Sequence, residues 1–204
     1  MRLLIATRNK DKIAEIREIL KDLKLEIVSA YDIPGMPDVV EDQDTIEGNA
    51  IKKAVECAAY SGLYALADDT GLFVDALNGE PGVYSARFAG EECSYKNNRD
   101  KMLQEMQGRK NRHAQFRTVV AFASPAGLIA TAEGKVDGEI TEKEFGTGGF
   151  GYDVIFRATE TGMTFGEMST KEKEKISHRG RAFRNILPIV TQTSCLRTIS
   201  KTEL

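Results

Sequence analysis

The sequence predicts an α/β protein with a largely parallel or mixed sheet. Residues 3–6 form an apolar run typical of a buried strand, residues 11–23 carry apolar side chains at helical spacing, and residues 25–29 form a second apolar run. Because two strands joined by a helix usually run parallel, these segments predict a β-α-β unit. This opening places the chain in the α/β class.

The following segments extend the same pattern. Residues 45–61 predict a second helix, interrupted near its start by Gly48, and this helix leads into a strand over residues 64–69. Residues 115–124 and 128–137 alternate between apolar and polar side chains around a Pro-Ala-Gly turn. That pattern predicts a long β-hairpin.

The second half of the chain adds two helices and a polar tail. Residues 94–107 predict a surface helix, and residues 170–189 predict a strongly basic helix. Residues from about 191 to 204 are polar and predict a frayed tail. Because no repeat or low-complexity linker separates these segments, residues 1–204 predict a single domain of two lobes.

Composition narrows the class of protein further. A net charge of −3 gives no general attraction to nucleic acid or to an acidic membrane, so a polyanion must bind at a local basic cluster. Three cysteines without a Cys-x-x-Cys pair argue against a disulfide framework or a zinc site and favour a reducing compartment. The sequence shows neither a signal peptide nor an uncharged run near the ~18 residues of a membrane span. These observations predict a cytoplasmic protein whose partner is neither a nucleic-acid polymer nor a membrane.

Two adjacent carboxylates follow apolar residues in the predicted strand 64–69. If this segment is extended, Asp68 and Asp69 point to opposite faces unless the strand ends between them. A buried acid needs water, a cation or several hydrogen-bond donors, and a pair that holds Mg²⁺ and deprotonates a water meets that need. The alternative is structural, because Asp or Thr70 before Gly71 can cap a turn or a helix. The tetrapeptide leaves both interpretations open.

A polar segment between the first predicted strand and helix is placed to bind an anion. Backbone N–H groups and the helix dipole favour anions at a helix N-terminus. Thr7 and Asn9 can hydrogen-bond such a ligand, and Lys12 can add positive charge. The segment is equally suited to capping the helix through Asn9 or Asp11.

A glycine-rich segment, residues 146–153, permits close approach of the backbone to a ligand. Phe150 and Tyr152 add flat apolar surface that suits a nucleobase, and Asp153 adds a hydrogen-bond acceptor for its edge. The segment matches neither a Walker A loop nor a dinucleotide fingerprint. A hairpin loop with aromatic anchors is the structural alternative.

Two further charged segments contain candidate contacts to a nucleotide or its metal ion. Charges after residue 170 alternate in sign, and solvent exposure is the usual outcome for such a run. His178 and Arg179 interrupt the alternation, because this pair can recognise a purine edge or a phosphate, whereas a packed surface histidine is the alternative. Glu41 precedes a predicted helix, where it can bind Mg²⁺ together with Asp69 or simply favour the helix N-terminus.

Taken together, these segments resemble the inosine/xanthosine triphosphate pyrophosphatase family. The resemblance extends from Thr7 to about Leu187 and rests on six motifs that occur in order. They are Thr7-x-Asn9-x-x-Lys12; Glu41 with Thr45, Asn49-Ala50, Lys52 and Ala54; Ala67-Asp68-Asp69-Thr70-Gly71-Leu72; Pro81-Gly82-x-x-Ser85-Ala86-Arg87; Gly146 to Asp153; and Ser177-His178-Arg179. Each motif is weak by itself, and their joint occurrence is hard to obtain by chance.

The resemblance implies an enzyme that hydrolyses noncanonical purine nucleoside triphosphates (ITP, dITP and XTP) to the monophosphate and pyrophosphate, and so removes them from the nucleotide pool. It also implies an elongated mixed β-sheet with flanking helices that form two lobes around a central cleft, and a homodimer. Glu41 and Asp69 would hold Mg²⁺, Asp69 would accept a proton, and Asp68 would assist the water or the metal. The triphosphate would bind at Thr7, Arg8, Asn9, Lys10, Asp11, Lys12 and Lys52, and the nucleoside at Thr70, Phe150, Gly151, Tyr152, Asp153, Lys173, His178 and Arg179.

One motif departs from the family pattern, which usually has Glu at the position of Gly48. Glu47 is one residue away, and a shift of one residue turns a helical side chain by about 100°, so Glu47 is no automatic substitute. Two alternatives therefore stay open. They are a nucleotide-binding sensor that has lost turnover and a phosphohydrolase with another nucleotide or product preference.

Overall fold

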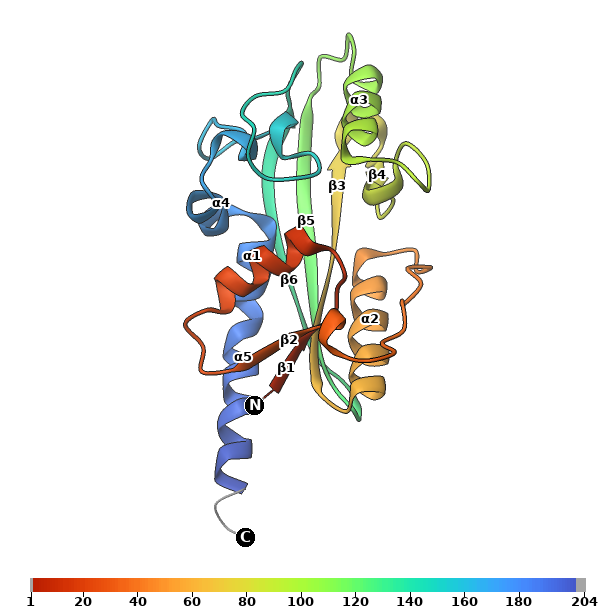
Figure 1. The fold of residues 1–204 in the computed structure, drawn as a ribbon. Helices are drawn as coiled ribbons and strands as arrows, with labels where there is room; N and C mark the ends of the chain where they lie inside the picture. Colours follow the sequence, from red (N-terminus) through yellow and green to blue (C-terminus); the bar gives the residue numbers. More distant parts are fainter. Residues whose placement is uncertain (1, 201–204) are drawn as a thin grey trace. The chain divides into compact units, whose positions relative to one another are not determined.

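The computed structural model describes residues 2–200, with side chains for residues 2–194. Seven strands and five α-helices occur in this part of the chain (Figure 1). The strands are β1 (Arg2–Ile5), β2 (Glu26–Ser29), β3 (Tyr64–Val74), β4 (Pro81–Gly82), β5 (His113–Ser124), β6 (Gly127–Ile140) and β7 (Phe156–Ala158). The helices are α1 (Lys10–Leu20), α2 (Ile46–Ser61), α3 (Tyr95–Glu105), α4 (Thr170–Ile176) and α5 (His178–Ser200). The predicted α/β class is confirmed.

A mixed sheet joins the strands in the order β2-β1-β3-β5-β6-β7, with β4 paired to β3. Strand β1 runs parallel to β2 and to β3, whereas the β3–β4 and β6–β7 pairs are antiparallel. Leu4 of β1 lies opposite Val28 of β2 and Ala65 of β3. The hairpin predicted from the sequence is also present, because β5 and β6 are neighbours joined by a turn at Pro125 and Ala126.

The described residues divide into two compact units, each considered by itself below. Unit 1 comprises the described residues of Met1–Asp69, Val119–Gly134 and Arg181–Leu204, and unit 2 comprises Thr70–Thr118 and Lys135–Gly180. Strands β3, β5 and β6 contribute residues to both units.

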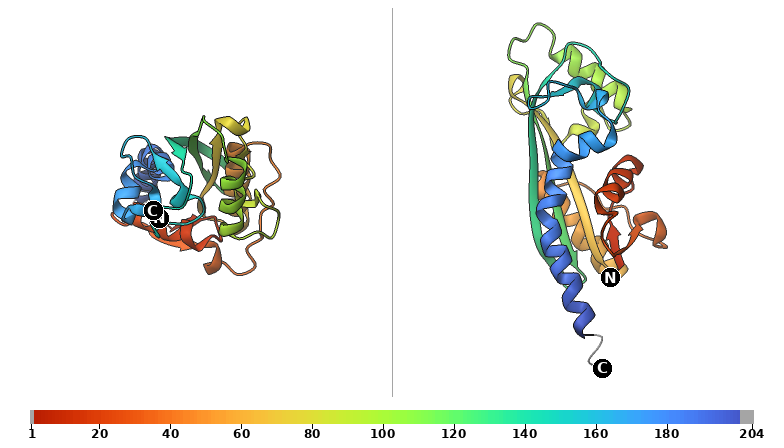
Figure 2. Two further views of the ribbon diagram at one scale, coloured as in Figure 1. Left: turned by 90° about the horizontal axis from the view of Figure 1, so that it is seen from above. Right: turned by 90° about the vertical axis from the view of Figure 1, so that its left-hand side faces the viewer.

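Unit 1 begins with the predicted β-α-β arrangement. Because β-α-β crossovers are right-handed and the chain passes from β1 to β2 in one direction and from β2 to β3 in the other, α1 and α2 cover opposite faces of the sheet. The part of α5 in this unit shares a face with α1, while α2 lies on the other side of the strands (Figures 1 and 2). Buried residues of α1, α5 and the strands form one apolar core, which includes Ile5, Ile16, Leu66, Phe122 and Phe183.

Side-chain caps define where α1 and α2 begin. Asn9 caps α1, because its side chain accepts hydrogen bonds from the backbone N–H groups of Asp11 and Lys12. Thr45 caps α2, because its side chain accepts from the N–H of Gly48. The predicted interruption of α2 at Gly48 is wrong, since this residue lies in the first turn, where the Thr45 hydroxyl satisfies its N–H.

Three predicted boundaries also differ in the structure. Strand β3 continues to Val74, so Asp68 and Asp69 lie inside it rather than at its end. The helix predicted over residues 170–189 is two helices, because Ser177 has extended backbone angles between α4 and α5. Helix α5 continues through Pro188 to Ser200, where the sequence predicted a frayed tail, and residues 201–204 lie outside the described part of the chain.

Unit 2 has its own apolar core. It joins buried residues of β3, α3, β5, β6 and β7 with the segment between β7 and α4, among them Leu72, Met102, Phe116, Phe156 and Phe165. Within residues 2–200, none of the helices combines the length and apolar character that crossing a membrane requires.

Candidate active site

The two adjacent aspartates of β3 point to opposite faces, as the alternation of an extended strand requires. Asp68 Oδ2 lies 3.1 Å from the Lys12 ammonium of α1. Asp69 Oδ2 accepts a hydrogen bond of 3.2 Å from Asn49 Nδ2 of α2. Both side chains are buried, with 0% and 8% exposure. The capping alternative for this tetrapeptide is therefore wrong, because the strand continues beyond it.

Lys53 of α2 connects the acids of unit 1. Its ammonium donates to Glu41 Oε1 at 2.5 Å and to the backbone carbonyl of Asp68 at 2.8 Å, and it lies 3.6 Å from Asp69 Oδ1. The side chain is only 10% exposed. We refer to Lys12, Glu41, Asn49, Lys53, Asp68 and Asp69 as the acid–lysine cluster.

The sequence predicts Lys52 as a triphosphate ligand, whereas in the structure Lys53 is the lysine that contacts Glu41 and Asp69. Lys52 instead pairs with Asp42, whose side chain is 53% exposed, at 2.7 Å. The missed signal was helical spacing: Lys53 follows Asn49 by four residues, so both lie on the buried face of α2. Lys52 precedes Lys53 by one residue, and a step of one residue along a helix turns the side chain by about 100°, so Lys52 points away from the buried face of α2.

Burial and mutual attraction set the ionisation of the acid–lysine cluster. Burial raises the pKa of Asp69 above its usual range, because attraction by Lys53 and Lys12 offsets the burial only in part. Burial also opposes ionisation of Glu41, but the Lys53 ammonium outweighs it and lowers the pKa of Glu41. Burial disfavours the charged form of Lys53, yet attraction by Asp69 and Glu41 prevails and raises its pKa. Of Glu41 and Asp69, Asp69 is thus the carboxyl that is better suited to accept a proton.

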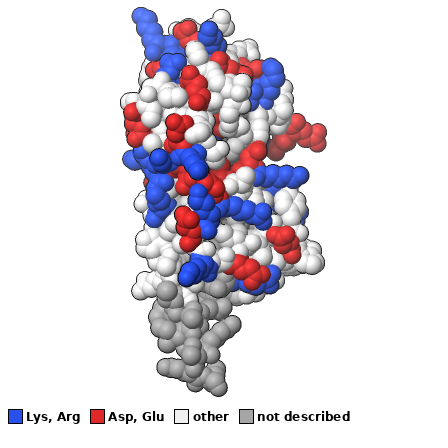
Figure 3. Space-filling view, turned by 60° about the vertical axis from the view of Figure 1, so that its left-hand side comes forward, with Lys and Arg blue, Asp and Glu red and all other residues white. Residues whose placement is uncertain are grey.

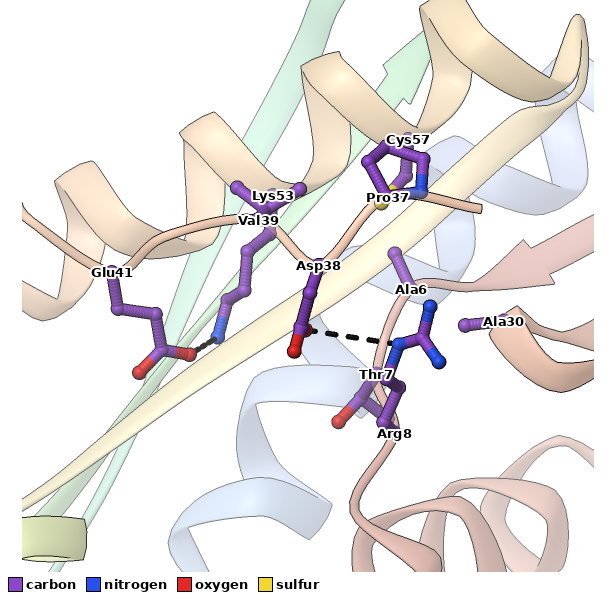
Figure 4. Close-up of a pocket in the computed structure, with 10 residues that line it drawn as sticks. All are labelled: Ala6, Thr7, Arg8, Ala30, Pro37, Asp38, Val39, Glu41, Lys53 and Cys57. Atoms are coloured by element: carbon purple, nitrogen blue, oxygen red, sulfur yellow. Dashed lines mark hydrogen bonds and ion pairs between the residues drawn. The ribbon is translucent and has the colours of Figure 1, made fainter. Parts of the chain in front are cut away.

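A small polar pocket adjoins the cluster in unit 1 (Figure 4). Its volume is about 80 Å³, and Thr7, Arg8, Glu41 and Lys53 are among the residues that line it. Arg8 donates to the backbone carbonyl of Met36 at 2.5 Å and lies 3.7 Å from the exposed carboxylate of Asp38. The pocket is too small for a nucleoside, and its lining combines two cations, Arg8 and Lys53, with two carboxylates, Asp38 and Glu41.

A second cluster lies in unit 2 around the glycine-rich segment. Lys173 donates to Asp153 Oδ2 at 2.5 Å, and the same oxygen accepts from the backbone N–H of Phe150 at 2.8 Å. The Lys173 ammonium lies 4.8 Å from the Phe150 ring centroid. Lys173 is buried although its charged neighbours in sequence, Lys171 and Lys175, are exposed. The prediction that the charge run after residue 170 is exposed to solvent is therefore wrong for Lys173.

His178 and Arg179 complete this second cluster. The His178 ring stacks on Phe116 with centroids 4.4 Å apart and planes 14° apart, and it is 3% exposed. Arg179 is 2% exposed, and its Nη2 donates to Thr70 Oγ1 at 3.2 Å. Arg179 also lies 5.7 Å from the Phe150 ring centroid. We refer to Thr70, Phe150, Asp153, Lys173, His178 and Arg179 as the aromatic–cation cluster.

Some predicted site residues lie outside both clusters. The Tyr152 ring is buried, and its hydroxyl donates to Ser85 O at 2.8 Å, so this residue is an anchor of the loop rather than open surface for a base. Burial raises the pKa of the Tyr152 hydroxyl, in keeping with that role. Lys10 and Asp11 are exposed in the first turn of α1.

Gly48 lies in the first turn of α2, close to the side chains of Gln43 and Thr45. A Cβ at this position would lie 2.8 Å from Gln43 Cβ and 3.2 Å from Thr45 Oγ1. Space near Gly48 is thus taken by the Gln43 side chain, and an acid here would first have to displace it.

Charge on one face of the molecule is mixed in sign (Figure 3). On the face drawn in Figure 3, Lys and Arg side chains are interspersed with Asp and Glu side chains. This distribution agrees with the small net charge and with anion binding at local groups rather than along an extended basic surface.

The fold and the two clusters define an α/β protein with buried groups of the kind that bind phosphate and an aromatic base. The model of the Ham1 family matches residues 3–189, and the chain belongs to this family. The chain is 46% identical over 194 residues to a dITP/XTP pyrophosphatase of Desulforamulus reducens, covering 94% of this chain and 96% of the relative. It is 48% identical over 183 residues to a protein of the same name from Geobacter sulfurreducens, covering 89% and 92% of the two chains. A solved HAM1 protein from Coxiella burnetii has a TM-score of 0.85 at 34% identity, covering 94% of this chain and 99% of that one.

Proposed function

We propose that this protein hydrolyses the noncanonical purine nucleoside triphosphates ITP, dITP and XTP to the monophosphate and pyrophosphate. The relatives named dITP/XTP pyrophosphatase support this activity, because the similarity covers nearly the whole of both chains. The observation in this chain that carries it is Asp69, a buried carboxyl with a raised pKa, held between Asn49 and Lys53. We also propose that the protein is a soluble enzyme of the cytoplasm, that it acts as a homodimer, and that it clears such nucleotides from the pool.

The acid–lysine cluster supplies the groups that hydrolysis needs. Asp69 is the proposed acceptor of the proton from the attacking water, because its raised pKa brings it nearer to the working pH. Lys12 and Lys53 provide fixed positive charge that stabilises negative charge on phosphate oxygens in the transition state. Asp68 holds Lys12 in place.

Magnesium is the metal that this cluster suits. Glu41 and Asp69 both approach one cation, the Lys53 ammonium, and carboxylate oxygens are the ligands that Mg²⁺ takes together with substrate phosphates. Among the side chains that the structure describes, residues 2–194, no group of three His, Cys, Asp or Glu residues could hold a metal ion. When bound, the ion would neutralise charge on the phosphate oxygens. Glu41 and Asp69 are its proposed ligands.

The aromatic–cation cluster is the proposed nucleoside site. Phe150 offers a ring for stacking, and Arg179 offers N–H donors. Inosine and xanthosine carry a 6-oxo group where adenosine carries an amine, so donors from Arg179 or His178 favour these bases over adenine. Rejection of GTP requires crowding or an unmatched group at the 2-amino position of guanine.

A substrate panel with product identification tests this function. The protein is incubated with ITP, dITP, XTP, ATP and GTP in the presence of Mg²⁺, and the products are separated by chromatography. We expect monophosphate and pyrophosphate from ITP, dITP and XTP, and little product from ATP. Release of single phosphates would instead identify a phosphohydrolase, and ITP binding without hydrolysis would identify a nucleotide sensor.

The Asp69→Asn variant gives a matched test of the mechanism. The amide keeps the size of the side chain but cannot accept the proton, so we expect ITP binding to persist while kcat falls by at least about 100-fold. Near-normal turnover of this variant would remove Asp69 from its proposed role.

A further inference from the structure

Helix α3 presents two side chains to the glycine-rich segment 146–153 of unit 2. Tyr95 and Arg99 are four residues apart and therefore lie on one face of the helix. The ring centroids of Tyr95 and Phe150 are 5.8 Å apart, with planes inclined by 40°. Arg99 Nη1 donates to the backbone carbonyl of Gly151 at 3.2 Å. Neither Tyr95 nor Arg99 belongs to the motifs of the family resemblance.

The contacted segment depends on its neighbours for a fixed conformation. Three of its glycines have positive φ angles of 76°, 69° and 60°, namely Gly146, Gly149 and Gly151. Glycine loses the most conformational freedom on ordering, so contacts from outside the segment must offset that cost. Asp153 anchors the backbone N–H of Phe150, and Tyr152 anchors the segment to Ser85. Tyr95 and Arg99 add contacts to the Phe150 ring and to the carbonyl that follows it.

Arg99 is itself held in place. Its Nε pairs with Glu144 Oε1 at 2.6 Å, and its side chain is 18% exposed. A guanidinium has donors that point in fixed, different directions, so one Arg99 side chain can bind Glu144 and the Gly151 carbonyl together. Arg99 of α3 thus holds the segment at two points: at Glu144, two residues before the segment begins, and at Gly151 within it.

We propose that Tyr95 and Arg99 are positioning residues for the nucleobase, which they orient through Phe150 without touching the base. This proposal rests on the proposed function, since it takes the Phe150 ring as the stacking surface. The Tyr95 ring supports the Phe150 ring, and the Arg99 guanidinium fixes the backbone that carries it. A ligand with a purine base gains from this support, whereas pyrophosphate has no base and does not.

Binding of inosine monophosphate and of pyrophosphate, measured by calorimetry, tests this inference without requiring turnover. In Arg99→Met and in Tyr95→Ala, we expect affinity for inosine monophosphate to fall about tenfold, the scale of one lost hydrogen bond to a charged donor or one aromatic pair. Affinity for pyrophosphate should stay unchanged in both variants. Tyr95→Phe keeps the ring and should bind inosine monophosphate like the wild type.

Lys96→Ala is the matched control on the same helix. Lys96 pairs with Asp100 at 2.6 Å on the exposed surface of α3, so its loss should change neither affinity. For ITP hydrolysis, we expect Arg99→Met to raise KM about tenfold and to leave kcat unchanged, since the acid–lysine cluster is intact.

Separate results distinguish this inference from the proposed function. Unchanged affinity of Arg99→Met and Tyr95→Ala for inosine monophosphate would overturn the inference even if the wild type hydrolyses ITP. Equal losses for inosine monophosphate and pyrophosphate would also overturn it, because they would indicate general damage to the fold. A wild type that binds inosine monophosphate but hydrolyses no ITP would refute the proposed function, and the affinity losses of the variants would still support the inference. Should Arg99→Met fail to fold, Tyr95→Ala decides the matter, because Tyr95 is 40% exposed.

Discussion

Replacing Lys53 by Met removes the ammonium that connects the acids of unit 1. In the wild type this group lies 2.5 Å from Glu41 Oε1, 3.6 Å from Asp69 Oδ1 and 2.8 Å from the backbone carbonyl of Asp68. Methionine keeps most of the volume of the side chain, so the change tests charge and hydrogen bonding rather than packing.

The expected loss of stability follows from the burial of the partners. Removing one member of a buried ion pair costs about 3–5 kcal/mol, because the remaining charge is left uncompensated. The Glu41 side chain retains 33% exposure and Asp69 can take up a proton, so we expect the lower end, about 3 kcal/mol in the free energy of unfolding. For a chain of this length, that corresponds to a fall of roughly 6–12 °C in Tm.

The sign of the pH dependence fixes the conditions of the measurement. The folded pKa of Lys53 lies above its ordinary value of 10.5. Its contribution to stability is therefore fully present below that value and is lost only as the pH rises through the folded pKa. Thermal unfolding near neutral pH thus compares the wild type, in which Lys53 is charged, with Lys53→Met, which carries no charge at this position.

Turnover should fall more steeply than stability. Because Lys53 is the proposed source of fixed positive charge for the phosphates, its loss is expected to lower kcat for ITP by about 10²–10³-fold. Lys52→Met is the matched control, since it removes a neighbouring lysine whose pair with Asp42 is partly exposed and is worth less than about 1 kcal/mol. Equal loss of turnover in the two variants, or a greater loss in Lys52→Met, would refute the assignment of Lys53.

Two further predictions concern the glycine-rich segment and the contact between Thr164 and Glu167 at the start of a short 3₁₀ helix, Phe165–Glu167. In Gly149→Ala, the added Cβ would lie 2.1 Å from Asp153 Oδ2, at a backbone φ of +69°. We therefore expect the affinity for inosine monophosphate to fall by at least about tenfold and the Tm to fall as well. Unchanged affinity and unchanged Tm would show that the segment rearranges freely. The Glu167 carboxylate accepts hydrogen bonds from the N–H and hydroxyl of Thr164, which lower its pKa, so its stabilising effect is present above the ordinary value of 4.5 and is lost as the pH falls through the folded pKa. An NMR titration of Glu167 should show this lowered pKa, and Thr164→Val should move it back toward 4.5.

Local patterns in the chain predict several elements correctly. The apolar runs and helical spacing of the first residues identify β1, α1 and β2, because short-range periodicity reports directly which face of an element is buried. Asn9 is recognisable as a cap, since capping involves residues only two or three positions apart.

Elements whose extent depends on distant partners are predicted less well. Strand β3 continues five residues beyond Asp69, to Val74, where it pairs with β4. The close approach of Gly82 to Gly71 in that pair is a contact between residues eleven positions apart in sequence. Because the polar residues Asp68, Asp69 and Thr70 carry no information on the pairing of β3 with β4, they cannot predict that the strand continues to Val74.

By itself, the sequence determined the α/β class and the family resemblance, and it identified Asp69 as a candidate site residue, because these depend on residue type and order. Only the tertiary structure decided which carboxylates the Lys53 ammonium contacts, that Lys173 is buried within a charge run, and that Tyr152 is an anchor. The physical reason is the same for all three residues. Charge and aromatic character can be read from the chain, but burial and the identity of a partner arise when segments far apart in sequence pack together.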